Sequence, residues 1–167
     1  MKVLLLSDTH SYIDDRILSY VKAADEVWHA GDIGSLEVTD SIEEFTRLRA
    51  VYGNIDSDKI RQAFPLHQKF EIDNLKVFIT HIGGYPKRYN PRIKNELYAY
   101  KPDLFICGHS HILKVMRDEK LNLLHMNPGA IGIQGFHQKR TMLRFSIENS
   151  ILKDLEVIDF GKRGAKA

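Results

Sequence analysis

Short apolar runs alternate with helical stripes in the first half of the chain, and this alternation restricts the fold more than any other feature. Residues 3–6 are a continuous apolar run, typical of a strand buried on both faces. Four apolar residues with helical spacing follow: Ile13, Ile17, Val21 and Ala24. Residues 26–30 then predict a strand, residues 38–48 a helix and residues 50–52 a third strand. This order predicts parallel β-α-β units.

The second half has a different pattern. Residues 76–80 predict a strand, Ile93 and Leu97 mark a helix that ends before Pro102, and residues 104–107 predict another strand. Four short strands without helices follow, at residues 113–117, 121–126, 141–147 and 151–158. The turn-forming residues 148–150 join the last two as a hairpin. We therefore expect an α/β fold in which one sheet packs on another, with helices outside.

Length and composition predict one globular domain. The chain has 167 residues without an internal repeat or linker, so we expect a domain at 1–160 and a basic, frayed tail at 161–167. A content of 43% hydrophobic and 28% charged residues is ordinary for a globular protein. The net charge of +2 is too small to predict binding to nucleic acid or to an anionic membrane.

The cysteine content and the apolar segments predict a cytoplasmic protein. Cys107 is the single cysteine, which excludes an internal disulfide and fits a reducing compartment. It lies in an apolar strand, so we expect a buried thiol. The apolar run at 3–6 is shorter than the roughly 7–15 residues of a secretory signal. No segment approaches the roughly 20 apolar residues of a membrane span.

Seven polar residues each follow the end of a predicted strand: Asp8, His10, Asp32, Asn54, His81, His109 and His111. Ligands bind at this edge of open α/β sheets, because the loops there converge. Carboxylate, amide oxygen and imidazole together favour divalent ions such as Mn²⁺, Fe²⁺ or Zn²⁺. Seven donors exceed one tetrahedral zinc site and suit two ions that share a ligand, as in enzymes of phosphoryl displacement.

A structural explanation exists for each of these residues taken singly. A lone His or Asp near a strand end is more often a satisfied polar residue, and Asp8 and Asp32 could both cap helices. That explanation must account for seven such residues at matching strand ends, so the sequence favours the metal site.

The same residues resemble a known family. Five motifs match, in order, the calcineurin-like metallophosphoesterase superfamily: Asp8 with His10, Gly31 with Asp32, Gly53 with Asn54, Thr80 with His81, and Gly108 with His109 and His111. The chain length and the residues Asn127, Pro128, Gly129 and Ala130 resemble its small bacterial and archaeal phosphodiesterase branch. The resemblance covers residues 1–160 and implies a four-layer α/β/β/α sandwich, with two mixed β-sheets flanked by helices.

The resemblance also implies a role for each residue. Asp8, His10 and His111 would hold one divalent ion, and Asn54, His81 and His109 a second. Asp32 would bridge the ions together with a hydroxide, the nucleophile, so that the catalytic set is Asp32, Asn54 and His81. The implied activity is hydrolysis of small phosphodiesters. Mn²⁺ is the expected ion, with iron, zinc and nickel as alternatives.

The sequence departs from the family pattern at Ile55 and Ile82. The superfamily often has a histidine after the Gly-Asn pair, which assists the phosphate or protonates the leaving group. With Ile55 there, we expect a preference for good leaving groups, or an acid from water or another loop, because general-acid help is worth about 10²–10⁴ in rate. Ile82 separates His81 from the glycine that usually follows it, which should reshape residues 83–86 without removing the ligand.

Other polar residues have less certain roles. Asp56 is predicted to orient a ligand without touching the metal. His29 fits that role or a buried hydrogen-bonded one equally, and His125 is expected near the site without a part in catalysis. Two histidines are predicted to be surface residues: His67 and His137. Three basic residues could bind a substrate phosphate or form a solvated face: Lys87, Arg88 and Arg92.

Two other functions are compatible with the sequence. One is a protein-interaction scaffold, as in the metallophosphoesterase-like subunit of the retromer coat, whose metal site is altered. The complete ligand set argues against this, because buried donors without metal would be unpaired. The other is a phosphomonoesterase or nucleotide phosphatase, including a nucleotide pyrophosphatase or a cyclic-nucleotide phosphodiesterase. The expected partner is a small phosphoester substrate, with no membrane and no specific nucleic acid, and a homo-oligomer is compatible with the family.

Overall fold

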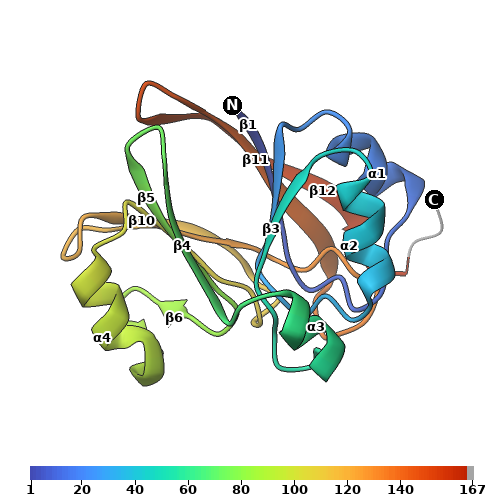
Figure 1. The fold of residues 1–167 in the computed structure, drawn as a ribbon, viewed down its shortest axis with the longest axis horizontal. Coiled ribbons are helices and arrows are strands. Elements are labelled where there is room, and N and C mark those ends of the chain that lie inside the picture. The colour runs from blue at the N-terminus through green and yellow to red at the C-terminus, as the bar shows by residue number, and fades with distance from the viewer. Residues whose placement is uncertain (165–167) are drawn as a thin grey trace.

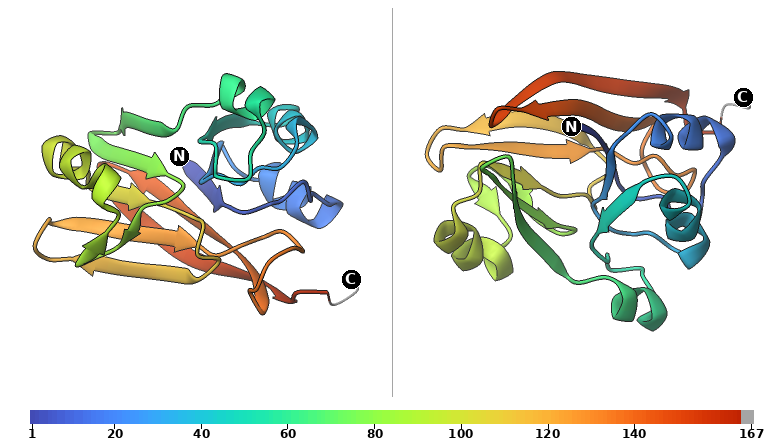
Figure 2. Two further views of the ribbon diagram at one scale, coloured as in Figure 1. Left: turned by 90° about the horizontal axis from the view of Figure 1, so that it is seen from below. Right: turned by 45° about the horizontal axis from the view of Figure 1, so that its top comes forward.

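Two five-stranded sheets packed face to face form the centre of the molecule (Figures 1 and 2). The computed structural model describes residues 1–164. The first sheet has the strand order β12 (Ile151–Lys162), β11 (Lys139–Glu148), β1 (Lys2–Leu6), β2 (Glu26–His29) and β3 (Arg47–Ala50). β1, β2 and β3 are parallel, while β11 runs antiparallel to β1 and β12.

The second sheet is also mixed. Its order is β4 (His67–Ile72), β5 (Leu75–Thr80), β8 (Leu104–Ile106), β10 (Leu123–Pro128) and β9 (Leu113–Asp118). The central strands β5, β8 and β10 are parallel, and the outer strands β4 and β9 are antiparallel to them. A small ribbon of β6 (Gly84–Tyr85) and β7 (Arg88–Tyr89) follows β5.

Helices cover the outer face of each sheet, which completes four layers. α1 (Asp15–Val21), α2 (Leu36–Glu43) and α3 (Asp58–Ala63) pack on the first sheet, and α4 (Pro91–Tyr100) packs on the second (Figure 1). β1 shows why its apolar run is continuous. Val3 and Leu5 point into the core between the sheets, and Leu4 and Leu6 point to the helices. The predicted α/β/β/α sandwich is confirmed.

The boundaries in the segment 36–50 differ from the prediction. α2 ends at Glu43 and β3 begins at Arg47, so Leu48 is a strand residue and not part of the helix. Phe45, which fits the helical spacing, has 45% of its surface exposed in the turn between them. The helical spacing of apolar residues therefore extends by coincidence to Phe45 and Leu48, which lie beyond the end of α2. α3, β4 and the β6–β7 ribbon were not predicted.

β12 extends to Lys162, whose partner in β11 is Lys139. Two residues of the expected tail therefore belong to a strand. Residues 165–167 lie outside the described residues, and the division at 160 stays a prediction. No helix in the described part of the chain is long and apolar enough to cross a membrane.

The predicted hairpin at 148–150 is present, and its tip contacts another one. Asn149 and Ser150 both have positive φ, 51° and 63°, as a two-residue turn of type I′ requires. The backbone N–H of Ser150 donates to Asp73 Oδ2 at 2.8 Å, and Asn74 Nδ2 lies 3.3 Å from Ser150 Oγ. Asp73 and Asn74 form the β4–β5 turn, so this contact joins the two sheets.

Candidate metal centre

The predicted ligands meet where strands of both sheets end. In the first sheet, Asp8 and His10 follow β1, Asp32 follows β2 and Asn54 follows β3. In the second sheet, His81 follows β5, and His109 and His111 follow β8. Three parallel strands of the first sheet and two of the second therefore direct their following loops to one place between the sheets.

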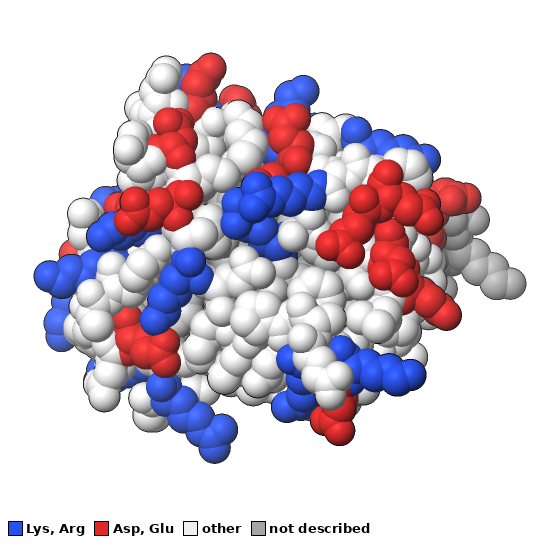
Figure 3. Space-filling view, viewed as in Figure 1, with Lys and Arg blue, Asp and Glu red and all other residues white. Residues whose placement is uncertain are grey.

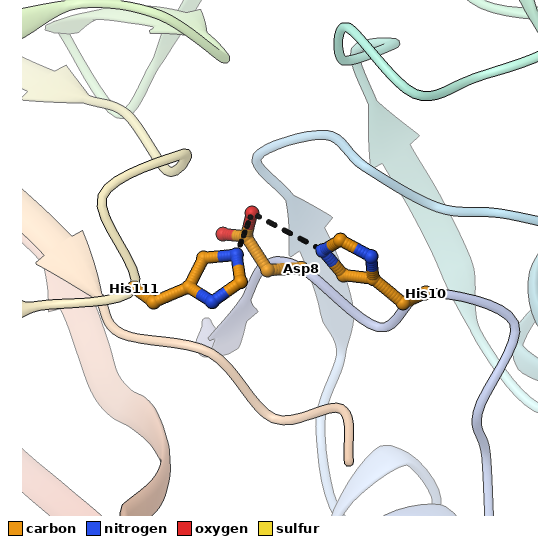
Figure 4. Close-up of side chains that lie close together, drawn as sticks. All are labelled: Asp8, His10 and His111. Carbon is orange, nitrogen blue, oxygen red and sulfur yellow. Dashed lines mark ion pairs between the residues drawn. The ribbon is translucent and has the colours of Figure 1, made fainter. Parts of the chain in front are cut away.

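Six of these residues form two groups whose nitrogen and oxygen atoms lie within 4.8 Å of one another. The first group is Asp8, His10 and His111, with the carboxylate between the two rings (Figure 4). Asp8 Oδ1 lies 3.1 Å from His111 Nε2 and 3.9 Å from His10 Nε2. The composition of this group is the one that the family resemblance implies for one ion.

The second group is Asp32, His81 and His109. Asp32 Oδ1 lies 3.2 Å from His81 Nε2, while Asp32 Oδ2 lies 3.7 Å from His10 Nε2 in the first group. The two oxygens of Asp32 thus face different groups, an arrangement that fits a bridging carboxylate. Asn54 is exposed beside them and lines one cavity with His81.

Hydrogen bonds orient Asp8 and His81 so that each keeps one atom free to bind a metal ion. Asp8 Oδ2 accepts from Ser7 Oγ at 2.6 Å and from the backbone N–H of His109 at 3.2 Å. His81 Nδ1 lies 2.7 Å from the carbonyl oxygen of Ala30, which can only accept, so this nitrogen carries the proton. In the neutral ring, His81 Nε2 therefore presents a lone pair.

Three buried atoms in the centre have no hydrogen-bond partner: Asp8 Oδ1, His10 Nε2 and His81 Nε2. A buried polar atom without a partner costs about 1–3 kcal/mol. All three can offer a lone pair, and all three lie within 4.0 Å of a carboxylate oxygen of the centre or are one. A divalent cation between them satisfies all three at once, so the residues present fit a metal centre.

The charges of the site also suit a cation. Burial opposes ionisation of Asp8, but the imidazoles of His10 and His111 outweigh it and hold the pKa of Asp8 below its ordinary range. For Asp32, His81 overcomes the effect of burial in the same way and lowers the pKa. The carboxylates in turn raise the pKa of His10 and His81. Protons thus compete for these nitrogens, and metal binding must weaken in acid.

Five of the seven predicted ligands have a positive φ: Asp8 (55°), His10 (49°), Asp32 (54°), His109 (68°) and His111 (58°). Such backbone is rare for residues other than glycine and costs about 1–3 kcal/mol each. Backbone hydrogen bonds hold two of them in place: Asp8 N donates to Gly31 O at 2.9 Å and His10 N to Asp32 O at 3.1 Å.

Asp56 holds two of the ligand-bearing loops together. Its carboxylate accepts from the backbone N–H groups of Gly34 and Gly53, both at 2.7 Å, and of Ile33 at 3.2 Å. It therefore acts on the loops that carry Asp32 and Asn54, and not on a ligand side chain. The approach is close, because a Cβ atom on Gly53 would lie 2.0 Å from Asp32 Oδ1.

Two buried histidines have structural contacts. His29 Nδ1 accepts from the backbone N–H of Gly31 at 3.1 Å, and His29 Nε2 lies 2.9 Å from Thr9 Oγ1. Complete burial lowers the pKa of His29 to about 4, so the ring is neutral. This is the buried hydrogen-bonded role. His125 Nε2 donates to the carbonyl of Gly84 at 2.9 Å, and His125 belongs to neither ligand group.

The prediction that His67 and His137 are surface residues is wrong for His137, which is buried, while His67 has intermediate exposure. His67 is half-buried, with Nδ1 2.9 Å from Thr80 Oγ1. His137 is only 8% exposed, and its Nδ1 lies 3.2 Å from Nδ1 of His111. A segment with glycines at 129, 132 and 135 precedes His137 and was the available signal that this loop passes over the centre.

Cys107 is buried as predicted, and burial raises the pKa of its thiol to about 12.

Two of the three basic residues that could bind a phosphate or form a solvated face lie beside the centre. Arg92 lines the cavity of about 310 Å³ that Asn54 and His81 border, and Arg88 lines a second of about 310 Å³ next to His109. Lys87 lines a different cavity, near β9. On the face in Figure 3 positive and negative side chains are interspersed, with an uncharged area between the positions of α4 and α3.

Both the sequence and the fold are similar to those of known proteins. The model of the calcineurin-like phosphoesterase superfamily domain matches residues 1–150. A probable metallophosphoesterase of Methanocaldococcus jannaschii is 28% identical over 160 residues, which are 90% of this chain and 78% of that protein.

Two solved structures show the same fold. Vps29 of Entamoeba histolytica, in complex with Zn²⁺, has a TM-score of 0.74 at 20% identity, over 96% of this chain and 100% of that chain. An archaeal phosphodiesterase has a TM-score of 0.70 at 24% identity, with the same coverage. Because the match to the family spans all of the predicted ligands and every strand of the two sheets except β12, the chain belongs to the calcineurin-like phosphoesterase superfamily and is a metal-dependent phosphoesterase.

Proposed function

We propose that the protein is a phosphodiesterase that hydrolyses small phosphodiesters with two divalent metal ions, Mn²⁺ being the first to test. One observation carries the proposal. Two ligand groups lie side by side, and the two oxygens of Asp32 face one group each. Neighbouring sites that share a carboxylate are the arrangement of two-metal phosphoryl-transfer enzymes.

The roles of the residues follow from their positions. Two bound ions would supply electrophilic activation of the phosphoryl group and lower the pKa of the attacking water. Asp8 and Asp32 are held ionised by the histidines around them, so they neutralise the cations. Arg92 and Arg88 border the site from two cavities and are placed to contact phosphoryl oxygens that do not react.

The cavity beside Asn54 and His81 supports a small diester as substrate. Its volume is about 310 Å³ and its wall includes Tyr52, Leu66 and Ile82. A phosphate over the two ligand groups has one ester substituent directed to this cavity, because Asn54 and His81 form both its wall and the edge of the site. An apolar or aromatic substituent suits this wall.

Position 55 supports a preference for good leaving groups. The backbone N–H of Ile55 donates to Asp32 Oδ1 at 3.1 Å, while its side chain is 47% exposed and cannot transfer a proton. Aryl esters need no acid catalyst to release their alcohol, whereas alkyl esters do.

A scaffold function is the second candidate, because the Vps29 structure has the same fold. The three buried atoms without partners favour catalysis. A protein that uses only its outer surface gains nothing from a buried donor set that costs stability without a cation.

The test is hydrolysis of a chromogenic aryl phosphodiester by metal-free protein before and after addition of Mn²⁺, with the matching monoester as second substrate. Asp32→Asn is compared with Asp40→Asn, a change of the same kind on the exposed surface of α2. We expect metal-dependent hydrolysis of the diester that Asp32→Asn abolishes and Asp40→Asn retains. Folded protein that binds Mn²⁺ but cleaves neither ester contradicts the proposal, and preference for the monoester would replace it with a phosphatase.

A further inference from the structure

The histidine that sequence reasoning placed on the surface forms a pair with one of the proposed ligands. His137 Nδ1 lies 3.2 Å from His111 Nδ1, and the two rings are nearly perpendicular, at 73°. The other nitrogen of His137, Nε2, lies 3.0 Å from the carbonyl oxygen of Gly132. The two ring nitrogens of His137 thus connect the backbone carbonyl of Gly132 to His111.

The carbonyl fixes the positions of the protons along this series. A carbonyl oxygen can only accept, so His137 Nε2 carries the proton and donates it. In the neutral ring Nδ1 of His137 then has a lone pair and accepts a hydrogen bond. His111 Nδ1 must therefore be the donor in the pair, and in the neutral ring the lone pair of His111 lies on Nε2, the atom 3.1 Å from Asp8 Oδ1.

The loop packs closely against this pair. A Cβ atom on Gly135, where φ is +122°, would lie 2.4 Å from both Nδ1 and Cε1 of His111 and 3.2 Å from His137 Nδ1. Gly132 N also donates to Asp8 O at 3.1 Å, which fixes the loop against the strand end that carries Asp8. The loop thus covers the side of the His111 ring that faces away from the carboxylate.

The other ligand group has the same arrangement in a simpler form. His81 Nδ1 donates directly to the carbonyl of Ala30, so its Nε2 lone pair is directed to Asp32. In the first group a side chain stands between the ligand and the carbonyl. Because a side chain makes the contact to His111, a substitution of His137 can remove it.

We propose that His137 is a positioning residue that holds His111 as the Nδ1–H tautomer, with Nε2 directed to the metal site beside Asp8. The proposal depends on the metal centre described under the proposed function. Partners that orient a ligating histidine in this way typically change metal affinity by 10–100-fold when they are removed.

Two substitutions separate the two contacts of His137. The amide of His137→Asn lies near the place of Nδ1 and retains an acceptor for His111, whereas that of His137→Gln lies near Nε2 and retains only the contact to Gly132. His125→Gln is the matched control, because His125 is also buried and bonded to a carbonyl but belongs to neither ligand group. Stepwise Zn²⁺ affinity is measured by competition with a chelator, with thermal unfolding as the check on folding.

We expect His137→Gln to weaken binding of one of the two ions by about 10–100-fold, and the other much less. His137→Asn should stay within about threefold of the wild type, and His125→Gln should not differ. Wild-type affinity for both ions in His137→Gln overturns the proposal, as does equal weakening in His137→Asn and His137→Gln.

A spectroscopic measurement on the unaltered protein is independent of folding defects. Long-range ¹H–¹⁵N spectra of the zinc-loaded protein report which ring nitrogen carries a proton. We expect a proton on Nδ1 of His111 and on Nε2 of His137, and the reverse assignment for either ring overturns the proposal. Protein that binds two ions and shows these tautomers but hydrolyses no phosphodiester contradicts the proposed activity alone.

Discussion

The proposed ligands combine chemistry that is visible in the sequence with backbone conformations that are not. Their residue types and their positions after apolar runs are sufficient to predict which residues converge. Asp and His are enriched among the non-glycine residues with positive φ, but this tendency is too weak to predict that Asp8, His10 and Asp32 all have it. These conformations depend on hydrogen bonds between loops that are distant in sequence, such as that of His10 N to Asp32 O.

Position 55 allows the proposed leaving-group preference to be reversed. Ile55→His places an imidazole beside Asp32 and Asn54, where it can protonate a leaving oxygen. We expect kcat for an alkyl phosphodiester to rise about tenfold, below the full value of a positioned acid, with little change for an aryl diester. Rates on both substrates are compared with those of Ile55→Asn, a polar control that does not act as an acid. An equal effect on both substrates would contradict the assignment.

His29 predicts a pH dependence of stability. Its pKa is about 4 in the folded protein and 6.5 ordinarily. Between these values the unfolded chain binds a proton that the folded protein does not, so folding stability must fall as the pH falls. The loss from His29 approaches about 3 kcal/mol at pH 4, at about 1.4 kcal/mol per pH unit. Urea unfolding of the metal-free protein at pH 7 and pH 5 should show a shallower dependence in His29→Gln; an unchanged slope would exclude His29 as the source.

At the scale of elements, Asp56 connects the loops after β2 and β3. Asp56→Asn removes the charge and turns one acceptor into a donor that faces backbone N–H groups. We expect a loss of about 2–3 kcal/mol in the free energy of unfolding, typical of hydrogen bonds to a charged group. Mn²⁺ affinity should fall as well, because Asp32 and Asn54 lie on these loops.

Asp118→Asn is the matched control for this change. Asp118 is also buried and accepts from Tyr89 Oη and from two backbone N–H groups, those of Lys120 and Leu121. We expect a similar loss of stability, measured by urea unfolding, with Mn²⁺ affinity unchanged. Equal loss of affinity in both variants would show that Asp56 acts through general stability only.

Sequence patterns predicted some elements better than others for a physical reason. β1, β2, α4 and the four C-terminal strands contain apolar residues that face a core, so periodicity reveals them. α3 has six residues and a single fully buried one, Ile60, which is too little for a period to appear. β4 lies at the edge of its sheet with half-buried and exposed residues only. Its place depends on pairing with β5, which no local pattern encodes.

At the scale of the whole molecule, each ligand group takes residues from both sheets. Asp8 and His10 belong to one sheet and His111 to the other, and Asp32 faces His81 and His109 across the same interface. Metal should therefore stabilise the fold as a whole. At 100 times the dissociation constant the gain is about 2.7 kcal/mol per site. Urea unfolding with Mn²⁺ or with chelator measures it, and the difference should shrink in Asp32→Asn. No gain from Mn²⁺ in the wild type would contradict the arrangement.

The contact between the hairpin tips at Asp73 and Ser150 lies at the opposite end of the strands from the ligands. If that contact acts as a pivot, motion of one sheet relative to the other displaces the ligand end most, because displacement grows with distance from the pivot. Hydrogen exchange should then show faster exchange on metal removal at residues 81–85 and 108–112, with residues 73–74 and 149–150 unchanged. Uniform acceleration would argue against a pivot. We therefore expect the spacing between the ligand-bearing loops to vary most in the metal-free protein, and bound cations to restrict it.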